Sequence, residues 1–223
     1  MESYIPKSAE IDKPGIDMEK CKNNIILKDN IFYNIYKRTL DIGTSFIGLI
    51  IGIPFLIVFG ALIKLEDKGP IFYKQERLGK NEKHFYVYKL RSMRVDAEKI
   101  GGAQWAQKND PRITNVGAFI RKTRIDEIPQ LLNILKGDMS IIGPRPERPE
   151  LTYKFNREIP GFINRLIIKP GLTGWAQVNG GYDMTPEEKI IWDIEYINNR
   201  SFMLDMKIIL KTIRVIFTGE GAR

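Results

Sequence analysis

The sequence predicts a mostly helical α/β domain built on membrane-associated helices. Three observations lead to this fold class. Residues 42–63 form an apolar run without a charge, residues 70–88 contain two strand-like segments around a turn, and residues 202–217 are apolar with cations along one stripe. We divide the 223-residue chain into a tail (1–30), a membrane helix (31–66) and a cytoplasmic domain (67–223).

The tail is polar and shows no sustained period, so we expect it to be disordered. The chain has one cysteine, Cys21, and one histidine, His84, which argues against a disulfide framework, a zinc site or catalysis by imidazole. Carboxylates therefore have to carry any acid, base or nucleophile role. The formal net charge of +8 favours an anionic partner.

The apolar run from Ile42 to Ile63 has 22 residues, which as a straight helix would span about 33 Å and cross a bilayer core. Pro54 stands near its middle, where proline removes a backbone hydrogen bond and kinks a helix. Cations flank both ends, so the positive-inside rule assigns no direction. These residues fit a re-entrant helix that bends at Pro54 and a kinked spanning helix equally well.

After this helix, residues 70–73 and 84–88 are typical of two strands of a hairpin. Many cations crowd this region, and beside a membrane such cations usually contact lipid headgroups. Lys89 and Arg91, nearest the strand end, are instead candidates to face a substrate phosphate. The set comprises Lys74, Arg77, Lys80, Lys83, Lys89, Arg91 and Arg94.

The central stretch, residues 117–149, places the adjacent carboxylates Asp126 and Glu127 between Arg121 and Arg145. Thr123 is a plausible N-cap, apolar side chains follow at helical spacing, and Gly137 ends the run. We therefore expect the pair in a first helical turn, where the macrodipole favours ionised carboxylates, with a break at Pro129. An ionised Asp126 can attack phosphorus. The alternative is an ordinary solvated helix start.

Beyond this pair, residues 139–142 are typical of a short strand, and Gly143-Pro144-Arg145-Pro146 stiffens the backbone around Arg145. A rigidly presented guanidinium suits a phosphate, which it binds with two parallel hydrogen bonds.

The last third of the domain leaves two alternatives open. Residues 168–180 fit a glycine-rich substrate loop or a turn and strand with Trp175 in the core. Thr185-Pro186-Glu187-Glu188 predicts a helix start, and the helix extends to about Asn198. Residues 202–217 fit an interfacial helix on a membrane or a buried core helix.

Several motifs in one order resemble the bacterial sugar transferase family, the monotopic phosphoglycosyl transferases. The resemblance runs from about Tyr33 to the C-terminus and is closest to the small, catalytic-domain-only members. The motifs are Lys37-Arg38-x-x-Asp41, Tyr88-Lys89-x-Arg91-Ser92-Met93, residues 121–130, Asn133-x-x-Lys136-Gly137-Asp138-Met139-Ser140, Gly143-Pro144-Arg145-Pro146 and Pro170-Gly171-x-Thr173-Gly174.

The resemblance implies an enzyme at the cytoplasmic face of the bacterial inner membrane. It would transfer a sugar 1-phosphate from a nucleotide sugar, usually a UDP-sugar, to polyprenyl (undecaprenyl) phosphate and so begin assembly of a surface glycan. Asp126 would be the nucleophile of a covalent phosphosugar intermediate, with loss of UMP, and Glu127 would hold Mg²⁺. Lys89, Arg121 and Arg145 would bind the phosphates. Pro54 would make the membrane helix re-entrant and the protein monotopic.

Two residues depart from the family pattern, because Ile53 and Arg124 stand where serine is common. A binding module for anionic lipid or nucleotide sugar without chemistry is the main alternative, and hydrolysis through Asp126 is a nearer one. The charge-free run argues against nucleic acid as a partner. The sequence does not identify the sugar, and it leaves the oligomeric state open, with a homodimer possible.

Overall fold

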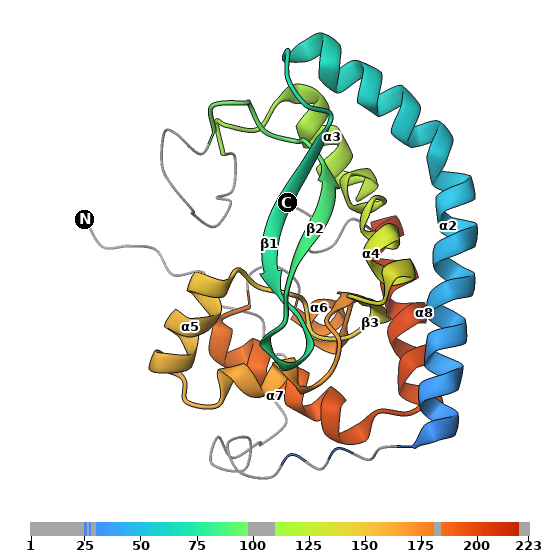
Figure 1. The fold of residues 1–223 in the computed structure, drawn as a ribbon, viewed down its shortest axis with the longest axis vertical. Coiled ribbons are helices and arrows are strands. Elements are labelled where there is room, and N and C mark those ends of the chain that lie inside the picture. Colours follow the sequence, from blue (N-terminus) through green and yellow to red (C-terminus); the bar gives the residue numbers. More distant parts are fainter. Residues whose placement is uncertain (1–24, 26, 28–29, 98–109, 181–183, 219–223) are drawn as a thin grey trace.

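The structure, a computed structural model, describes residues 25, 27, 30–97, 110–180 and 184–218. The predicted tail and Cys21 therefore lie almost wholly outside the described part of the chain. The mostly helical α/β class is confirmed, because helices surround two small sheets (Figure 1). In chain order the elements are α2 (Ile31–Glu66), β1 (Phe72–Leu78), η1 (Lys80–Glu82), β2 (His84–Leu90), α3 (Asn115–Lys122), η2 (Ile125–Glu127), α4 (Gln130–Lys136), β3 (Ser140–Ile142), α5 (Pro149–Glu158), η3 (Phe162–Ile167), β4 (Gly171–Thr173), α6 (Trp175–Gly180), α7 (Pro186–Asn199) and α8 (Phe202–Thr218).

Asn30 is the N-cap of α2, and its side chain accepts hydrogen bonds from the backbone N–H groups of Phe32 and Tyr33. It continues to Glu66 with Pro54 inside, and Figure 1 shows that its upper part bends. Among the described helices, α2 is the one long and apolar enough to cross a membrane by length and composition. Only 17% of its most apolar window is buried, which argues against a core helix of a soluble protein. Re-entry into the membrane stays a prediction.

Three polar side chains tie the first turns of α2 to the domain. Lys37 Nζ lies 3.1 Å from the carboxylate of Asp205 in α8. Arg38 donates to two carbonyl oxygens at the C-terminal end of α4, each at 2.7 Å. Asp41 accepts hydrogen bonds from a hydroxyl and a backbone N–H of β3, at 2.9 and 2.8 Å. The Lys-Arg-x-x-Asp motif thus anchors α2 on three separate elements.

Further along α2, two glycines let the segment from Ile128 to Leu131 approach closely. A Cβ on Gly52 would lie 2.6 Å from the side chain of Ile128, and one on Gly48 would lie 2.9 Å from that of Leu131. Because Ile128 directly follows the acidic pair, this packing sets the pair against the middle of the membrane helix.

The predicted hairpin is confirmed and is longer than expected. Strands β1 and β2 pair antiparallel, with Tyr73 opposite Lys89 and Arg77 opposite Phe85. Since side chains alternate between the two faces of a strand, this register puts Gln75, Arg77 and Lys89 on one face. The predicted strand at residues 139–142 is β3, which pairs in parallel with β4.

The C-terminal helices form the main core with α5 and η3. Trp175 is 6% exposed and packs in this core, so the core interpretation of Trp175 is confirmed. The predicted helix start at Thr185 is also confirmed, with a capping box between Thr185 and Glu188. Helix α8 packs in the core through Ile208, which is fully buried, and exposes apolar side chains such as Met203, which is 75% exposed. The core interpretation of α8 is confirmed, and its contact with a membrane stays a prediction.

Candidate active site

The acidic pair lies in the 3₁₀ turn η2, between α3 and α4. Thr123 is the C-cap of α3, so its prediction as an N-cap is wrong, and so is the placement of the pair in a first α-helical turn. Arg124 adopts a left-handed conformation (φ 61°) after α3, and α4 starts only after Pro129. The predicted break at Pro129 is confirmed. Neighbouring side chains, rather than a helix macrodipole, therefore set the charges of Asp126 and Glu127.

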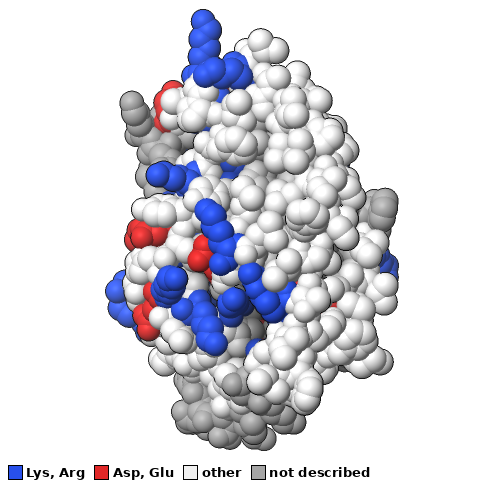
Figure 2. Space-filling model, turned by 45° about the vertical axis from the view of Figure 1, so that its right-hand side comes forward, with Lys and Arg blue, Asp and Glu red and all other residues white. Residues whose placement is uncertain are grey.

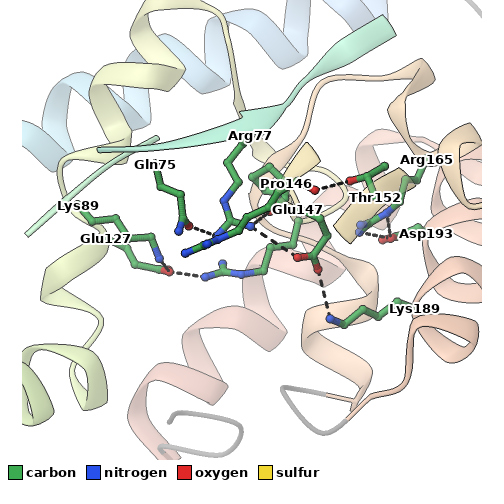
Figure 3. A network of polar contacts seen from close by, with 12 residues as sticks. Gln75, Arg77, Lys89, Glu127, Pro146, Glu147, Thr152, Arg165, Lys189 and Asp193 are labelled. Carbon is green, nitrogen blue, oxygen red and sulfur yellow. Dashed lines mark hydrogen bonds and ion pairs between the residues drawn. The ribbon is translucent and has the colours of Figure 1, made fainter. Parts of the chain in front are cut away.

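Glu127 is held by three cations. Its Oε1 accepts a hydrogen bond from Lys89 Nζ at 2.9 Å (Figure 3) and another from Arg145 Nη2. Arg124 Nη1 lies 3.9 Å from Oε2. Burial alone raises the pKa of a carboxyl group, but Arg145 and Lys89 hold the pKa of Glu127 well below its ordinary value. Glu127 is therefore a permanent, compensated anion.

Asp126 differs from its neighbour although both side chains are buried. Its carboxylate forms no ion pair with any residue that the structure describes. Burial raises the pKa of Asp126 to about 6, in opposition to the charge of Lys89 and with a further upward push from Glu127. Asp126 is thus mostly ionised at pH 7 yet poorly solvated and unpaired, as a carboxylate nucleophile requires. The expected anion is present, but its pKa is raised rather than lowered.

Arg121, at the end of α3, adds a cation whose charge lowers the pKa of Asp126. Its Nη1 is buried and has no hydrogen-bond partner among the described residues. Buried guanidinium donors are almost always satisfied, so this atom is suited to an anion that binds beside Asp126.

Behind Arg145, a second network positions the segment that carries it (Figure 3). Arg77 donates to the carbonyl oxygen of Pro146 at 2.9 Å and to the side chain of Gln75, and it lies 3.6 Å from Glu147. Glu147 also pairs with Lys189 of α7 at 3.3 Å. The assignment of Arg77 to lipid headgroups is therefore wrong. The alternation of side chains along β1, which places Arg77 on the face of Lys89, is the signal that could have identified it.

The structure brings together four of the predicted site residues, Lys89, Asp126, Glu127 and Arg145, with Arg121 beside Asp126. Pro54 lies outside this charged cluster, in the part of α2 that follows the contact with Ile128.

Arg91, the alternative phosphate ligand, does not join these residues. Its guanidinium donates to the carbonyl oxygen of Asp67 and lies 3.8 Å from the Asp67 carboxylate. Arg91 therefore binds the end of the membrane helix, and its prediction as a headgroup or substrate ligand is wrong.

The predicted Mg²⁺ has few candidate ligands. Within the described ranges, no group of three or more His, Cys, Asp and Glu side chains could hold a metal ion. Mg²⁺ is, however, often bound by one or two carboxylates together with substrate phosphates. Asp126 and Glu127 fit that mode, with the second oxygen of Glu127 less occupied than the first.

A buried carboxylate pair in a frame of cations, packed against a long apolar helix, defines a membrane-associated domain suited to a phosphate-bearing substrate. Residues 32–219 match the family described as bacterial sugar transferase, and the chain belongs to this family. This confirms the resemblance drawn from the motifs.

Curated relatives support the same family assignment. The UDP-N-acetylgalactosamine-undecaprenyl-phosphate N-acetylgalactosaminephosphotransferase of Aeromonas hydrophila is 48% identical over 194 residues, which cover 86% of this chain and 46% of the relative. A Bacillus subtilis protein, provisionally named an undecaprenyl-phosphate N-acetylgalactosaminyl 1-phosphate transferase, is 63% identical over 134 residues, 60% of this chain and 74% of the relative. The exopolysaccharide production protein PSS of Rhizobium leguminosarum bv. phaseoli is 41% identical over 196 residues, 84% of this chain and 98% of the relative. The chain thus spans under half of the first relative and nearly all of the third.

Proposed function

We propose that the protein is a phosphoglycosyl transferase that moves a sugar 1-phosphate from a UDP-sugar to undecaprenyl phosphate. The acceptor is supported by the names of the Aeromonas and Bacillus relatives. The observation that carries the mechanism is the asymmetry of the acidic pair, in which Glu127 is ion-paired and Asp126 is not.

In the first step a carboxylate oxygen of Asp126 attacks the phosphorus that bears the sugar. A new bond forms between this oxygen and phosphorus, the bridging P–O bond of the diphosphate breaks, and its electron pair leaves with UMP. In the second step an oxygen of undecaprenyl phosphate attacks the same phosphorus and releases the Asp126 carboxylate. The lipid-linked product keeps a sugar diphosphate, and neither step requires a separate acid.

The cations answer the main obstacle to this chemistry, the repulsion between an anionic nucleophile and an anionic substrate. Arg121 has a buried donor, Nη1, without a hydrogen-bond partner among the described residues, and this donor suits a phosphate oxygen. The ammonium group of Lys89 has three donors, so it can bind a phosphate oxygen without leaving the Glu127 carboxylate. Mg²⁺ held by Glu127 would supply further neutralisation of the diphosphate.

The membrane assignment follows from α2. A re-entrant helix bent at Pro54 would keep the domain on the cytoplasmic face, where UDP-sugars are present, and hold the acidic pair at the depth of the lipid phosphate. The contact between Gly52 and Ile128 supports this, because it joins the acidic pair to the middle of the apolar helix.

The test is formation of the lipid-linked product from undecaprenyl phosphate and Mg²⁺ with a panel of UDP-sugars. N-acetylgalactosamine occurs in the names of two relatives, so its UDP derivative is the first donor to test. We expect product and UMP in equal amounts, and neither with Asp126→Asn. Donor binding without product would favour a binding module, and free sugar phosphate instead of lipid product would favour hydrolysis.

A further inference from the structure

A second basic site lies at the turn end of the hairpin, where a pocket of about 250 Å³ opens between η1 and the C-terminal end of α4. We call it the turn pocket. It is lined by Gly79, Lys80, Asn81, Lys83, Phe85, Gly137, Asp138 and Lys169.

The turn pocket is separate from the acidic pair. Lys83 precedes β2 and Lys89 stands near its other end, and six residues of extended strand span about 20 Å. Helix α4 separates the two sites in the same way, with the acidic pair before its first turn and Gly137 after its last. A ligand in the turn pocket would therefore not contact Asp126.

The lysines of the turn pocket form no ion pairs with the residues that the structure describes. None of Lys80, Lys83 and Lys169 lies within ion-pair distance of a carboxylate that the structure describes, and Asp138 is the one acid in the lining. Figure 2, in which the α2 side comes forward, shows that Lys and Arg side chains gather on the lower half of this face beside a broad surface without charges.

Local backbone structure brings Lys169 and Arg38 close to the end of α4. Gly137 ends α4 as predicted, in the left-handed conformation (φ 89°), and a Cβ there would lie 3.4 Å from Lys169 Nζ and 3.7 Å from an Arg38 nitrogen. Opposite, the turn η1 keeps Asn81 in the left-handed region, with a φ of 53°. Burial, with the charges of Arg38 and Lys80, lowers the pKa of Lys169, although the carboxylates of Asp41 and Asp138 act in the opposite direction.

We infer that the turn pocket binds a phosphate group. Three lysines that line one pocket and form no ion pair with a described carboxylate suit an anion with several acceptor oxygens. The pocket is smaller than the usual 300–1,000 Å³ of sites that enclose a drug-sized ligand, so it suits a single phosphate headgroup rather than a nucleotide sugar. Both an anionic phospholipid and free phosphate carry this group, and the experiment separates them.

The experiment is calorimetric titration of the full chain in a neutral detergent. The probes are inorganic phosphate, dihexanoyl phosphatidylglycerol and, as a zwitterionic comparison, dihexanoyl phosphatidylcholine. The pocket variant is Lys80→Gln/Lys83→Gln/Lys169→Gln. The control variant, Lys74→Gln/Lys122→Gln/Lys154→Gln, removes the same charge from exposed positions outside the pocket. A further variant, Arg145→Met, distinguishes binding in the turn pocket from phosphate binding beside the acidic pair.

We expect a binding event that the pocket variant weakens at least tenfold, while the control and Arg145→Met keep it within about twofold. Its presence with phosphatidylglycerol but not with phosphate identifies a lipid headgroup, and its presence with phosphate identifies the free anion. Equal weakening by both triple variants, retained binding by the pocket variant, or no binding of either anion by the native chain overturns the inference. Because Lys80 and Lys83 are exposed, the pocket variant should fold, which thermal unfolding checks.

Discussion

The acidic pair and the turn pocket are both rich in cations, but they hold them differently. Around η2, Lys89 and Arg145 converge on the carboxylate of Glu127, so these cations have an anionic partner within the protein. In the turn pocket, Lys80, Lys83 and Lys169 form no ion pair with a carboxylate that the structure describes. Paired cations keep their positions when no substrate is bound, whereas cations without a carboxylate partner can accept an anion from solution. The first arrangement suits catalysis and the second suits binding.

Among the charged side chains around η2, Asp126 differs from the others. It is buried among cations but paired with none of the described residues, and that isolation leaves its oxygen atoms available to a phosphorus atom. The comparison therefore assigns the catalytic role to Asp126 and a structural role to Glu127, and substitutions can test this division.

The largest effect is expected from Asp126→Asn, which removes the nucleophile but keeps the shape of the side chain. Release of UMP should fall by roughly 10⁴-fold or more, because the residue acts in both chemical steps. The measurement is UMP release under saturating donor and acceptor. A decrease of less than tenfold would assign the nucleophile elsewhere.

The next largest effect is expected from Arg145→Met, which removes one of the cations that neutralise the charge of Glu127. A fully broken buried pair costs about 3–5 kcal/mol, and since Lys89 still contacts Glu127 we expect a loss of about 2 kcal/mol in the free energy of unfolding. Denaturant titration measures it. Adding Glu127→Gln should restore part of the loss, and a double variant less stable than the single one would contradict the pairing.

The same Asp126→Asn variant should be more stable than the native protein at pH 8. Because the folded-state pKa of about 6 lies above the ordinary value of 3.8, the ionised side chain costs roughly 3 kcal/mol of folding free energy above pH 6. This cost disappears as pH falls below about 4. Unfolding at pH 8 and pH 4 should thus show a gain only at the higher pH, and equal gains would exclude a raised pKa.

A smaller effect is expected in the pH dependence of the first chemical step. Below pH 6 the rate should increase about tenfold for each unit by which the pH increases, because a larger fraction of Asp126 is ionised. Above pH 7 the rate should level off. Single-turnover UMP release without lipid acceptor measures this step, because the acceptor phosphate itself titrates near pH 6. A flat profile between pH 5 and 7 would show that Asp126 is ionised throughout.

The smallest effect belongs to the turn pocket. Lys83→Gln should change the free energy of unfolding by less than about 0.5 kcal/mol and the rate of donor cleavage by less than about twofold, because the side chain is exposed and distant from Asp126. Denaturant titration measures the first quantity and UMP release measures the second. A tenfold loss of donor cleavage would show that the turn pocket and the acidic pair belong to one site.

Much of this organisation could be predicted from local sequence. The hairpin, the stop at Gly137, the capping box at Thr185 and the break at Pro129 follow from turn and capping chemistry, which acts over a few residues. The start of the helix around the acidic pair was predicted wrongly. A plausible cap at Thr123 does not reveal that Arg124 takes a left-handed conformation and ends a preceding helix.

Long-range pairing was beyond local reasoning. The carboxylate that Arg145 binds and the carbonyl oxygen that Arg77 reaches lie 18 and 69 residues away in the chain. Arg77 was assigned to lipid because cations beside a membrane segment usually face it, and Arg91 was a candidate for lipid or a substrate phosphate, but tertiary contacts turn both side chains inward. The division of roles between Asp126 and Glu127 likewise came from the resemblance to a family, and only the fold supplies a physical reason for it.

The most direct test of the central claim is intact and peptide mass spectrometry of the protein mixed with UDP-N-acetylgalactosamine and Mg²⁺, without lipid acceptor. We predict a mass increase of one phosphosugar, located on Asp126, that disappears when undecaprenyl phosphate is added and is absent in Asp126→Asn. If the native protein forms lipid-linked product at full rate while no adduct accumulates with any donor that supports turnover, Asp126 is not a covalent nucleophile and the transfer is direct.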